Sequence, residues 1–214
     1  AFAASGDTMY VDHLHPSRPG YDPGWEKRFN EYYGYNPQKA RQLLADAGYG
    51  PNKPLKLTIL SGVIAYLNSG SDIADSLAGY WRAVGIDPQI VTMDRAAEEN
   101  TRRTGKFDNH VKVWGDSGPI GDGVRQQVGT PWPANGFYTR EMQQKFNQAL
   151  VEVDEKKQDT LLREVGELGF TQFWGIPLWW VPQEAVVNSK VVKSYVFPGA
   201  VHGGWSHFEN IKLV

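Results

Sequence analysis

The residues of this chain that could most directly do chemistry are a serine, an aspartate and several histidines. Asp116 and Ser117 are neighbours in a Gly-Asp-Ser-Gly-Pro run, and His13, His15 and His110 precede them. A serine acts as a nucleophile only when a base lies within hydrogen-bond reach and a third group orients that base. No spacing in the sequence brings such a trio together. We therefore assign no catalytic residue and do not expect an enzyme, with a hydrolase of peptides or glycans as the lesser alternative.

Metal and cofactor chemistry are marked even less clearly. His13 and His15 flank one leucine, but no carboxylate or third histidine accompanies them, and zinc sites use three or four protein ligands. The chain contains no cysteine, which excludes disulfides, a thiol catalyst and thiolate metal ligands. No glycine-rich phosphate loop is present. We expect no metal ion and no cofactor.

The remaining candidate is a site that binds a ligand without changing it. Trp114, Gly115, Asp116 and Ser117 come at the end of the segment 107–114, which we expect to form a strand. In open α/β sheets, ligands bind beyond the carboxyl ends of the strands. An aromatic face, a flexible backbone and a carboxylate suit a ligand with an apolar surface and an amine or hydroxyl groups. A simple turn closed by Asp116 is the alternative, and the residues alone do not decide between the two.

A repeated order of helix, glycine and strand must position this loop. Asn36 and Pro37 predict the start of a helix that Gly48 ends, and residues 55–60 alternate as in a strand. The order then recurs twice, as helix 72–84 with strand 88–93 and as helix 95–103 with strand 107–114. Strands joined by such helices are parallel with right-handed crossovers, so the fold class is α/β.

Apolar stripes on the expected helices indicate which faces are buried. In the first helix the stripe consists of Ala40, Leu43, Leu44 and Ala47. Two later helices begin at caps provided by Thr139 and Asp154, and they carry the stripes Met142, Phe146, Ala149, Leu150, Val153 and Leu161, Leu162, Val165, Leu168. We expect all three stripes to face a core.

The ends of the chain are less regular. Residues 1–33 have no usable period and are rich in proline and glycine, which predicts an extended loop. Residues 176–181 are expected to form a short strand, and 188–190 a turn. The tail at 203–214 ends in a strand-like alternation with no obvious partner.

Composition limits the classes of partner. The formal net charge is -2 over 214 residues, which gives no case for nucleic acid or an anionic membrane surface as a partner. No apolar run approaches the roughly 18 residues that a membrane-spanning helix needs. The chain has 8 Trp and 10 Tyr residues, whose flat faces with a polar edge serve either a well-filled core or the binding of sugars, peptides and protein surfaces.

Several segments together resemble the family 5 extracellular solute-binding proteins of ABC importers, the dipeptide, oligopeptide and nickel receptors. The strongest is Asn36-Pro-Gln-Lys-Ala-Arg-Gln-Leu-Leu-Ala-Asp-Ala-Gly48, which is similar to the family segment YDPxKAxxLLxEAGY. Further similar segments follow in the family's order at 77–91, 105–108, 154–168, 176–178 and 204–205.

The resemblance implies a periplasmic-binding-protein type II-like lobe with a mixed, mostly parallel sheet flanked by helices. Residues 1–200 would be the C-terminal lobe of a two-lobe protein, with 1–33 as an extended loop. The tail at 201–214 would return to an N-terminal lobe that is absent from this sequence.

The resemblance also implies roles for the loop after the third strand. In peptide-binding members, an aspartate shortly after the tryptophan of the cleft strand pairs with the amino terminus of the peptide, and Asp116 is the matching residue. Trp114 and Trp132 would provide apolar walls, and Gly115 would allow close backbone approach, with Ser117 next to it. These five are the expected ligand-binding residues.

The class of solute stays open between an oligopeptide and an oligosaccharide. Val111 stands where oligopeptide-binding members can carry an arginine for the ligand carboxylate, and Trp114 and Trp132 would also suit stacking on sugar rings.

The implied function is capture of a small solute between two lobes, with hinge closure and delivery to an ABC permease in the membrane. The implied location is periplasmic or extracytoplasmic, with a lipoprotein anchor in a Gram-positive or similar cell. Half a cleft cannot bury a ligand, so this chain alone is expected to bind solute weakly. Apolar surface that normally faces the other lobe would favour self-association.

Overall fold

The computed structural model describes residues 8–11, 14–16, 19–61, 70–104, 108–113, 139–173, 175–180, 187–195 and 208–214. These residues divide into two compact units. The sheet unit comprises described residues from 28 to 113, and the helical unit comprises described residues from 8 to 27 and from 139 to 214. Helices and parallel strands alternate in the sheet unit, which confirms the α/β fold class.

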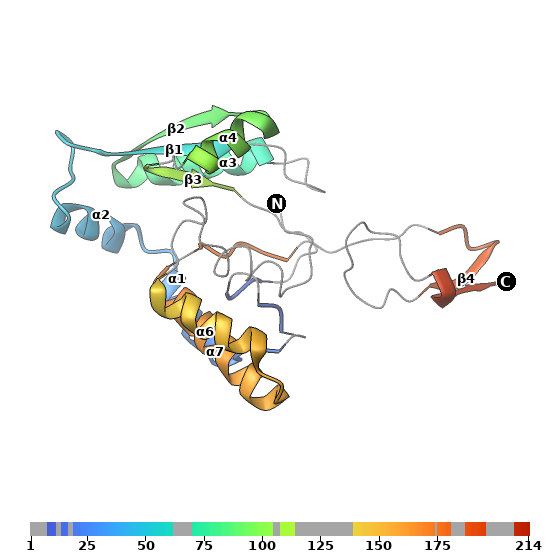
Figure 1. Cartoon of the computed structure of the whole chain (residues 1–214). Coiled ribbons are helices and arrows are strands. Elements are labelled where there is room, and N and C mark those ends of the chain that lie inside the picture. Colours follow the sequence, from blue (N-terminus) through green and yellow to red (C-terminus); the bar gives the residue numbers. More distant parts are fainter. Residues whose placement is uncertain are drawn as a thin grey trace. The chain divides into compact units, whose positions relative to one another are not determined.

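A three-stranded parallel sheet is the centre of the sheet unit (Figure 1). The strand β1 (Leu55–Ser61) lies between β2 (Ile86–Thr92) and β3 (His110–Lys112). Ile59 of β1 is paired with Ile90 on one side and Val111 on the other. The adjacent residues Ile59 and Leu60 are both buried, although they point to opposite faces, as is typical of a parallel sheet covered on both sides.

The predicted helices of the sheet unit are confirmed, although α3 starts two residues earlier and α4 ends one residue later than predicted. The helix α2 (Pro37–Asp46) begins where the Asn36 Oδ1 atom accepts a hydrogen bond from the Lys39 backbone N–H at 2.9 Å. The residue Gly48 just beyond its end has a φ of +82°, the left-handed conformation that favours glycine. The helices α3 (Gly70–Val84) and α4 (Arg95–Thr104) precede β2 and β3, and Asp94 caps α4 through the Ala97 N–H at 2.8 Å.

The apolar stripe predicted for α2 is not buried. No residue of α2 is buried, and the Leu43 side chain is 57% exposed. The helix contacts α3, where the Arg41 Nη2 atom donates a hydrogen bond to the Ala83 carbonyl oxygen at 3.2 Å. A stripe becomes buried only when another element lies against it, and no described element does so here. Tyr35 and Tyr80 lie edge to face beside this helix, 6.0 Å apart, and both are largely exposed.

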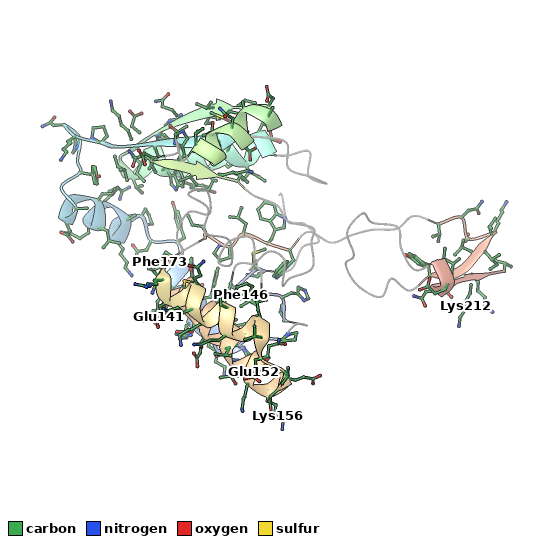
Figure 2. All side chains as sticks on the ribbon, in the orientation of Figure 1. Glu141, Phe146, Glu152, Lys156, Phe173 and Lys212 are labelled. Atoms are coloured by element: carbon green, nitrogen blue, oxygen red, sulfur yellow. The ribbon has the colours of Figure 1, made fainter. Side chains whose placement is uncertain are left out.

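A helical hairpin forms the core of the helical unit. The helices α6 (Arg140–Val151) and α7 (Glu155–Thr171) lie side by side (Figures 1 and 2). Both predicted caps are present, since the Thr139 hydroxyl accepts from the Met142 N–H and the Asp154 carboxylate accepts from the N–H groups of residues 156 and 157. Met142, Phe146 and Ala149 are buried as predicted, together with Val165 of α7.

The end of the α6 stripe departs from the prediction. Leu150 is 57% exposed and Val153 is 94% exposed. Leu150 lies in the last turn of α6, and Val153 lies in the short connection between α6 and α7.

The prediction of an extended loop over residues 1–33 is wrong for its last third. Residues Gly24–Tyr33 form helix α1, and its residue Trp25 is fully buried. Asp22 starts the helix, because its Oδ1 atom accepts from the Gly24 N–H at 2.7 Å and its carbonyl oxygen accepts from the Trp25 N–H at 3.1 Å. The proline and glycine at 23 and 24 suggested a loop, but they occupy the first turn of a capped helix, where both residues are tolerated.

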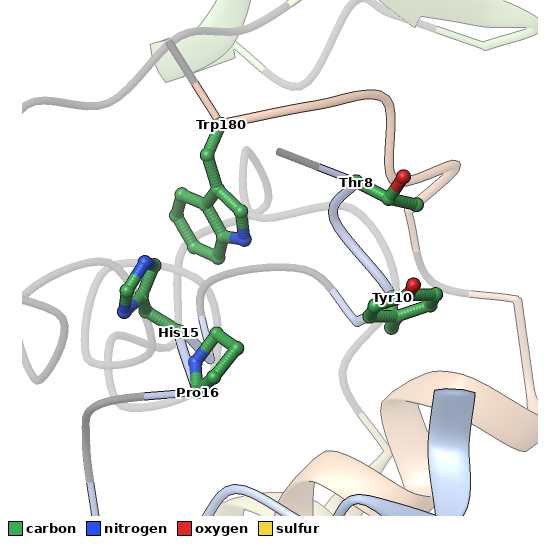
Figure 3. Close-up of a pocket in the computed structure, with 5 residues that line it drawn as sticks. All are labelled: Thr8, Tyr10, His15, Pro16 and Trp180. Carbon is green, nitrogen blue, oxygen red and sulfur yellow. The ribbon is translucent and has the colours of Figure 1, made fainter. Parts of the chain in front are cut away.

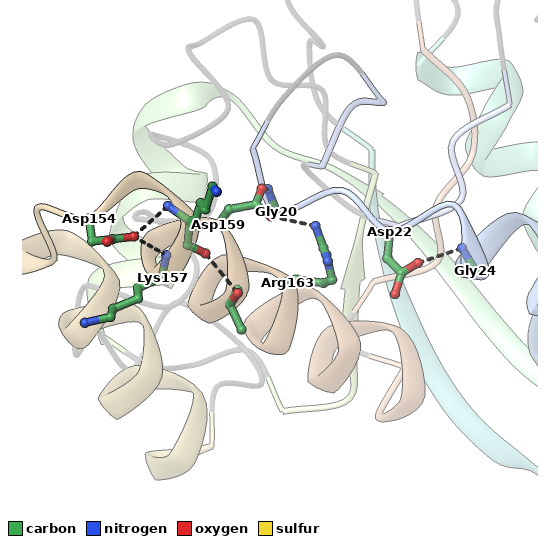
Figure 4. Close-up of polar contacts among 9 residues, drawn as sticks. Gly20, Asp22, Gly24, Asp154, Lys157, Asp159 and Arg163 are labelled. Carbon is green, nitrogen blue, oxygen red and sulfur yellow. Dashed lines mark hydrogen bonds and ion pairs between the residues drawn. The ribbon is translucent and has the colours of Figure 1, made fainter.

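The segment leading into α1 is fastened to α7 (Figure 4). The Gly20 N–H donates to the Asp159 Oδ1 atom at 2.6 Å, and Gly20 has a φ of +83°. The Trp25 indole nitrogen donates to the Glu167 Oε2 atom at 2.8 Å, and its ring stacks on Phe170 with centroids 6.4 Å apart. Gly166 leaves room for this indole, since a Cβ atom there would lie 2.6 Å from it.

The C-terminal tail, for which the sequence suggested no partner, pairs with another strand of this chain. The strand β4 (Val192–Tyr195) pairs in antiparallel fashion with β5 (Ile211–Leu213), which follows a short 3-10 helix, η2 (Phe208–Asn210). The predicted turn at 188–190 is confirmed, because the Asn188 side chain and carbonyl oxygen accept hydrogen bonds from residues 190 to 192. The expected return of the tail to another lobe stays a prediction.

The predicted strand at 176–181 makes only one isolated antiparallel bridge among the described residues, between Thr8 and Trp179. Among the helices that the structure describes, none is long and apolar enough to cross a membrane.

Candidate ligand-binding site

The carboxyl edge of the parallel sheet is where the sequence predicts a ligand. Because β1 and β3 are parallel neighbours, with Leu60 paired to Lys112, their chains leave the sheet at the same edge. Ser61 ends β1 there with 5% of its surface exposed, and Val113 follows β3 with 7% exposed. The strands that must position the predicted loop are thus present, in the order and direction that bring their carboxyl ends together.

The five predicted binding residues, Trp114, Gly115, Asp116, Ser117 and Trp132, lie outside the described residues. Their roles therefore stay a prediction. The structure describes the strand that leads to them up to Val113, which is buried at the sheet edge.

An ion pair ties α4 to β3 beside this edge. The Lys112 ammonium contacts the Glu98 carboxylate, and both side chains are more than two-thirds buried. The pair holds α4 against β3, and the Glu98 carboxylate neutralises the lysine. Lys112 is therefore occupied by a partner within the protein and is not an unpaired cation awaiting an anionic solute.

A pocket in the helical unit was not anticipated from the sequence. It has a volume of about 360 Å³ and is lined by Thr8, Tyr10, His15, Pro16 and Trp180 (Figure 3). The bridge between Thr8 and Trp179 brings the two segments together. The His15 ring lies edge to face against the Trp180 indole, with centroids 5.0 Å apart. The sequence placed His15 in a loop and Trp180 in a strand, and no spacing linked residues so far apart.

The described residues contain no group of three or more histidine, aspartate or glutamate side chains that could hold a metal ion. His15 packs on the indole of Trp180, and His110 lies on β3 with its Nδ1 atom 2.9 Å from the Asp108 carbonyl oxygen. Neither histidine stands beside a carboxylate in a described hydrogen bond.

A family comparison covers more than half of the chain. The model of the bacterial extracellular solute-binding proteins, family 5 (middle region), matches residues 6–136. The periplasmic murein peptide-binding protein MppA of Escherichia coli K12 is 35% identical over 77 residues, a match that covers 36% of this chain and 14% of MppA.

Solved structures share the fold. NikA from Brucella suis, in complex with Fe(III)-EDTA, matches 98% of this chain and 43% of its own, with a TM-score of 0.68 and 19% identity. OppA from Haemophilus influenzae, in complex with RPPGFSPFR, matches 83% of this chain and 35% of its own, with a TM-score of 0.61 and 18% identity. The chain therefore spans less than half the length of these relatives.

Proposed function

Since the chain belongs to the family 5 bacterial extracellular solute-binding proteins, we propose that it forms the C-terminal lobe of a receptor that captures a peptide-like solute for an ABC importer. The observation that carries this proposal is the family match over residues 6–136, which spans the whole parallel sheet and its helices. The family consists of binding proteins and not of enzymes, so the hydrolase alternative is set aside.

The proposed site is the loop that follows β3. Trp114 and Trp132 serve as apolar walls, Gly115 admits the solute backbone, and Asp116 accepts a hydrogen bond from the amino terminus of the peptide, with Ser117 beside it. The support for this placement is the parallel register of β1 and β3, whose chains leave the sheet together at its carboxyl edge. A carboxylate suits an ammonium group because charge-assisted hydrogen bonds are about twice as strong as neutral ones.

A peptide is favoured over an oligosaccharide by two relatives that are named for peptides. MppA is a murein peptide-binding protein and the matched OppA structure contains a nonapeptide, RPPGFSPFR. The aromatic residues Trp114 and Trp132 would also accept sugar rings, so an oligosaccharide is the second candidate.

The proposed receptor works outside the cytoplasmic membrane, in the periplasm or held by a lipoprotein anchor in a cell without an outer membrane. Its second lobe would close over the solute by a hinge motion and present both lobes to the permease.

A ligand screen tests this function on the chain joined to the proposed N-terminal lobe. Thermal melting is followed with tripeptides, nonapeptides and maltotriose, and a ligand at about 100 times its Kd should raise the free energy of unfolding by roughly 2.7 kcal/mol. The Asp116→Asn variant should weaken peptide binding about tenfold or more, because the ammonium group loses a charged partner.

The matched control is Trp179→Phe, which changes an aromatic residue far from the proposed loop in the sequence. It should bind peptide as the wild type does. Mass spectrometry of the released ligand should show it unchanged. A cleaved peptide would refute the receptor, and stabilisation by maltotriose alone would transfer the assignment to oligosaccharides.

A further inference from the structure

The pocket between residues 8–16 and 175–180 contains a hydrogen-bond donor without a partner. The Trp180 Nε1 atom is buried and makes no hydrogen bond. Figure 3 shows this nitrogen on the edge of the indole that faces Tyr10, across the space enclosed by the five lining residues. A buried indole N–H nearly always has a partner, so one that lacks it at the wall of a pocket indicates a place for an acceptor.

The lining determines what kind of acceptor fits. None of the five residues carries a fixed charge, since they are Thr8, Tyr10, His15, Pro16 and Trp180. Among the described lining residues, a carboxylate or phosphate would lose its hydration without gaining a fixed positive charge, which is unfavourable. An uncharged oxygen is the better match, and a carbonyl oxygen needs no donor in return.

The remaining surfaces favour a compact group around that oxygen. The volume of about 360 Å³ lies at the lower end of the range for small-molecule sites, so the pocket admits a group of about one residue or one sugar ring. Pro16 and the aromatic rings offer apolar contact, and the Thr8 hydroxyl group can donate or accept a second hydrogen bond.

We propose that this pocket is a second binding site, formed by residues other than the five proposed for the loop after β3, that takes an uncharged amide group with its carbonyl oxygen on the Trp180 indole N–H. Such an amide occurs both in a peptide bond and in an N-acetylated sugar. The bridge between Thr8 and Trp179 holds the two walls of the pocket together. The edge-to-face contact with His15 supports the indole on one side.

Nuclear magnetic resonance of the full 214-residue chain tests the proposal. The chain has 8 tryptophans, and the Trp180→Phe variant identifies the Trp180 indole signal by its loss. N-acetylglycine N-methylamide represents the peptide bond, N-acetylglucosamine represents the N-acetylated sugar, and glucose lacks the amide. We expect at least one amide probe to shift the Trp180 signal in a saturable manner, with a Kd of about 1–10 mM, as is reasonable for so few atoms.

Two variants separate the N–H from the shape of the ring. Trp180→Phe keeps an aromatic face but removes the donor, and it should weaken binding of the amide probe about tenfold, measured from the signals of neighbouring residues. Trp179→Phe alters the adjacent residue, which does not line the pocket, and should leave the affinity unchanged.

The amide probe that binds more tightly indicates whether the natural ligand supplies a peptide bond or an N-acetylated sugar. The proposal is overturned if neither amide probe shifts the Trp180 signal up to about 100 mM, if glucose binds as tightly as the amide probes, or if the two variants bind equally well.

Discussion

Single residues in this chain are held by a few specific contacts, and Tyr21 is a clear case. Its phenol hydroxyl donates a hydrogen bond to the Glu26 Oε1 atom at 2.7 Å, and its ring lies edge to face on Trp25. Burial, and then the hydrogen bond and charge of Glu26, raise the pKa of Tyr21 well above its ordinary value. An ionised phenol would place two negative charges side by side.

The raised pKa predicts how stability depends on pH. The native state holds the Tyr21 proton more tightly than the unfolded chain does. The hydroxyl group therefore contributes fully to the free energy of unfolding below a pH of about 10, and this contribution is lost as the pH rises above that. Tyr21→Phe should lower the free energy of unfolding by about 1 kcal/mol at pH 8. The difference from the wild type should shrink at pH 11, as measured by urea unfolding.

Tyr80→Phe provides the control, because Tyr80 is an exposed tyrosine of the other unit. This variant should follow the wild type at both pH values. If the free energy of unfolding of Tyr21→Phe differed from that of the wild type by the same amount at pH 8 and pH 11, the raised pKa of Tyr21 would be contradicted.

At the scale of the elements, Gly166 fixes how closely α1 approaches α7. A Cβ atom at this position would lie 2.5 Å from Leu14 Cδ1 and 2.6 Å from the Trp25 ring. Gly166→Ala should therefore destabilise the protein by roughly 1–3 kcal/mol, because the fully buried indole has no room to move. The measurement is urea unfolding followed by tryptophan fluorescence.

A glycine-to-alanine substitution in α3 should change the free energy of unfolding in the opposite direction. A Cβ atom at Gly79 would meet no atom within 4 Å, and Gly79 lies in the interior of that helix. Gly79→Ala should stabilise the protein by up to about 1 kcal/mol, since alanine has the higher helix propensity. Equal effects of the two substitutions would show that packing against Trp25 is not what requires Gly166.

The local signals in the sequence predicted these elements well. Asn36, Thr139 and Asp154 each cap the helix that they were expected to cap. A cap depends on residues two or three positions away, and a parallel βαβ unit depends on about thirty, so both can be recognised in the sequence.

Features that depend on distant partners could not be predicted in this way. The burial of Trp25 depends on Glu167 and Phe170, which come more than 140 residues later. The exposure of Leu43 depends on which element lies over α2, and the pocket at Trp180 depends on a bridge to Thr8. Of the candidate sites, the carboxyl edge of the sheet follows from the order of the strands in the sequence. The pocket can be recognised only in the three-dimensional structure.

At the scale of the whole molecule, an apolar face on the sheet unit predicts association. Tyr35, Leu43 and Tyr80 are 79%, 57% and 61% exposed. Tyr35 lies just before α2, Leu43 lies within α2, and Tyr80 lies in α3. Exposed apolar clusters favour contact with another protein surface. We expect the 214-residue chain to show an increasing sedimentation coefficient as its concentration rises from about 1 to 100 μM.

A pair of charge substitutions tests which surface is responsible. Leu43→Glu should reduce this association, whereas Val153→Glu, at another exposed apolar residue that lies in the helical unit, should not. A single species at all concentrations, or equal effects of the two variants, would contradict the role of the α2 face.

The division of the chain into two units has a consequence for the order in which it folds. The three strands of the parallel sheet all lie between residues 28 and 113, so they have all been synthesised when that stretch is complete. The helical unit is discontinuous, because residues 8–27 pack with residues beyond 139. Residues 8–27 must therefore wait for α7 before Trp25 can be buried, at the entropic cost of closing a loop of 142 residues. This segment is thus synthesised before the rest of the helical unit and is among the last parts of that unit to reach its native contacts.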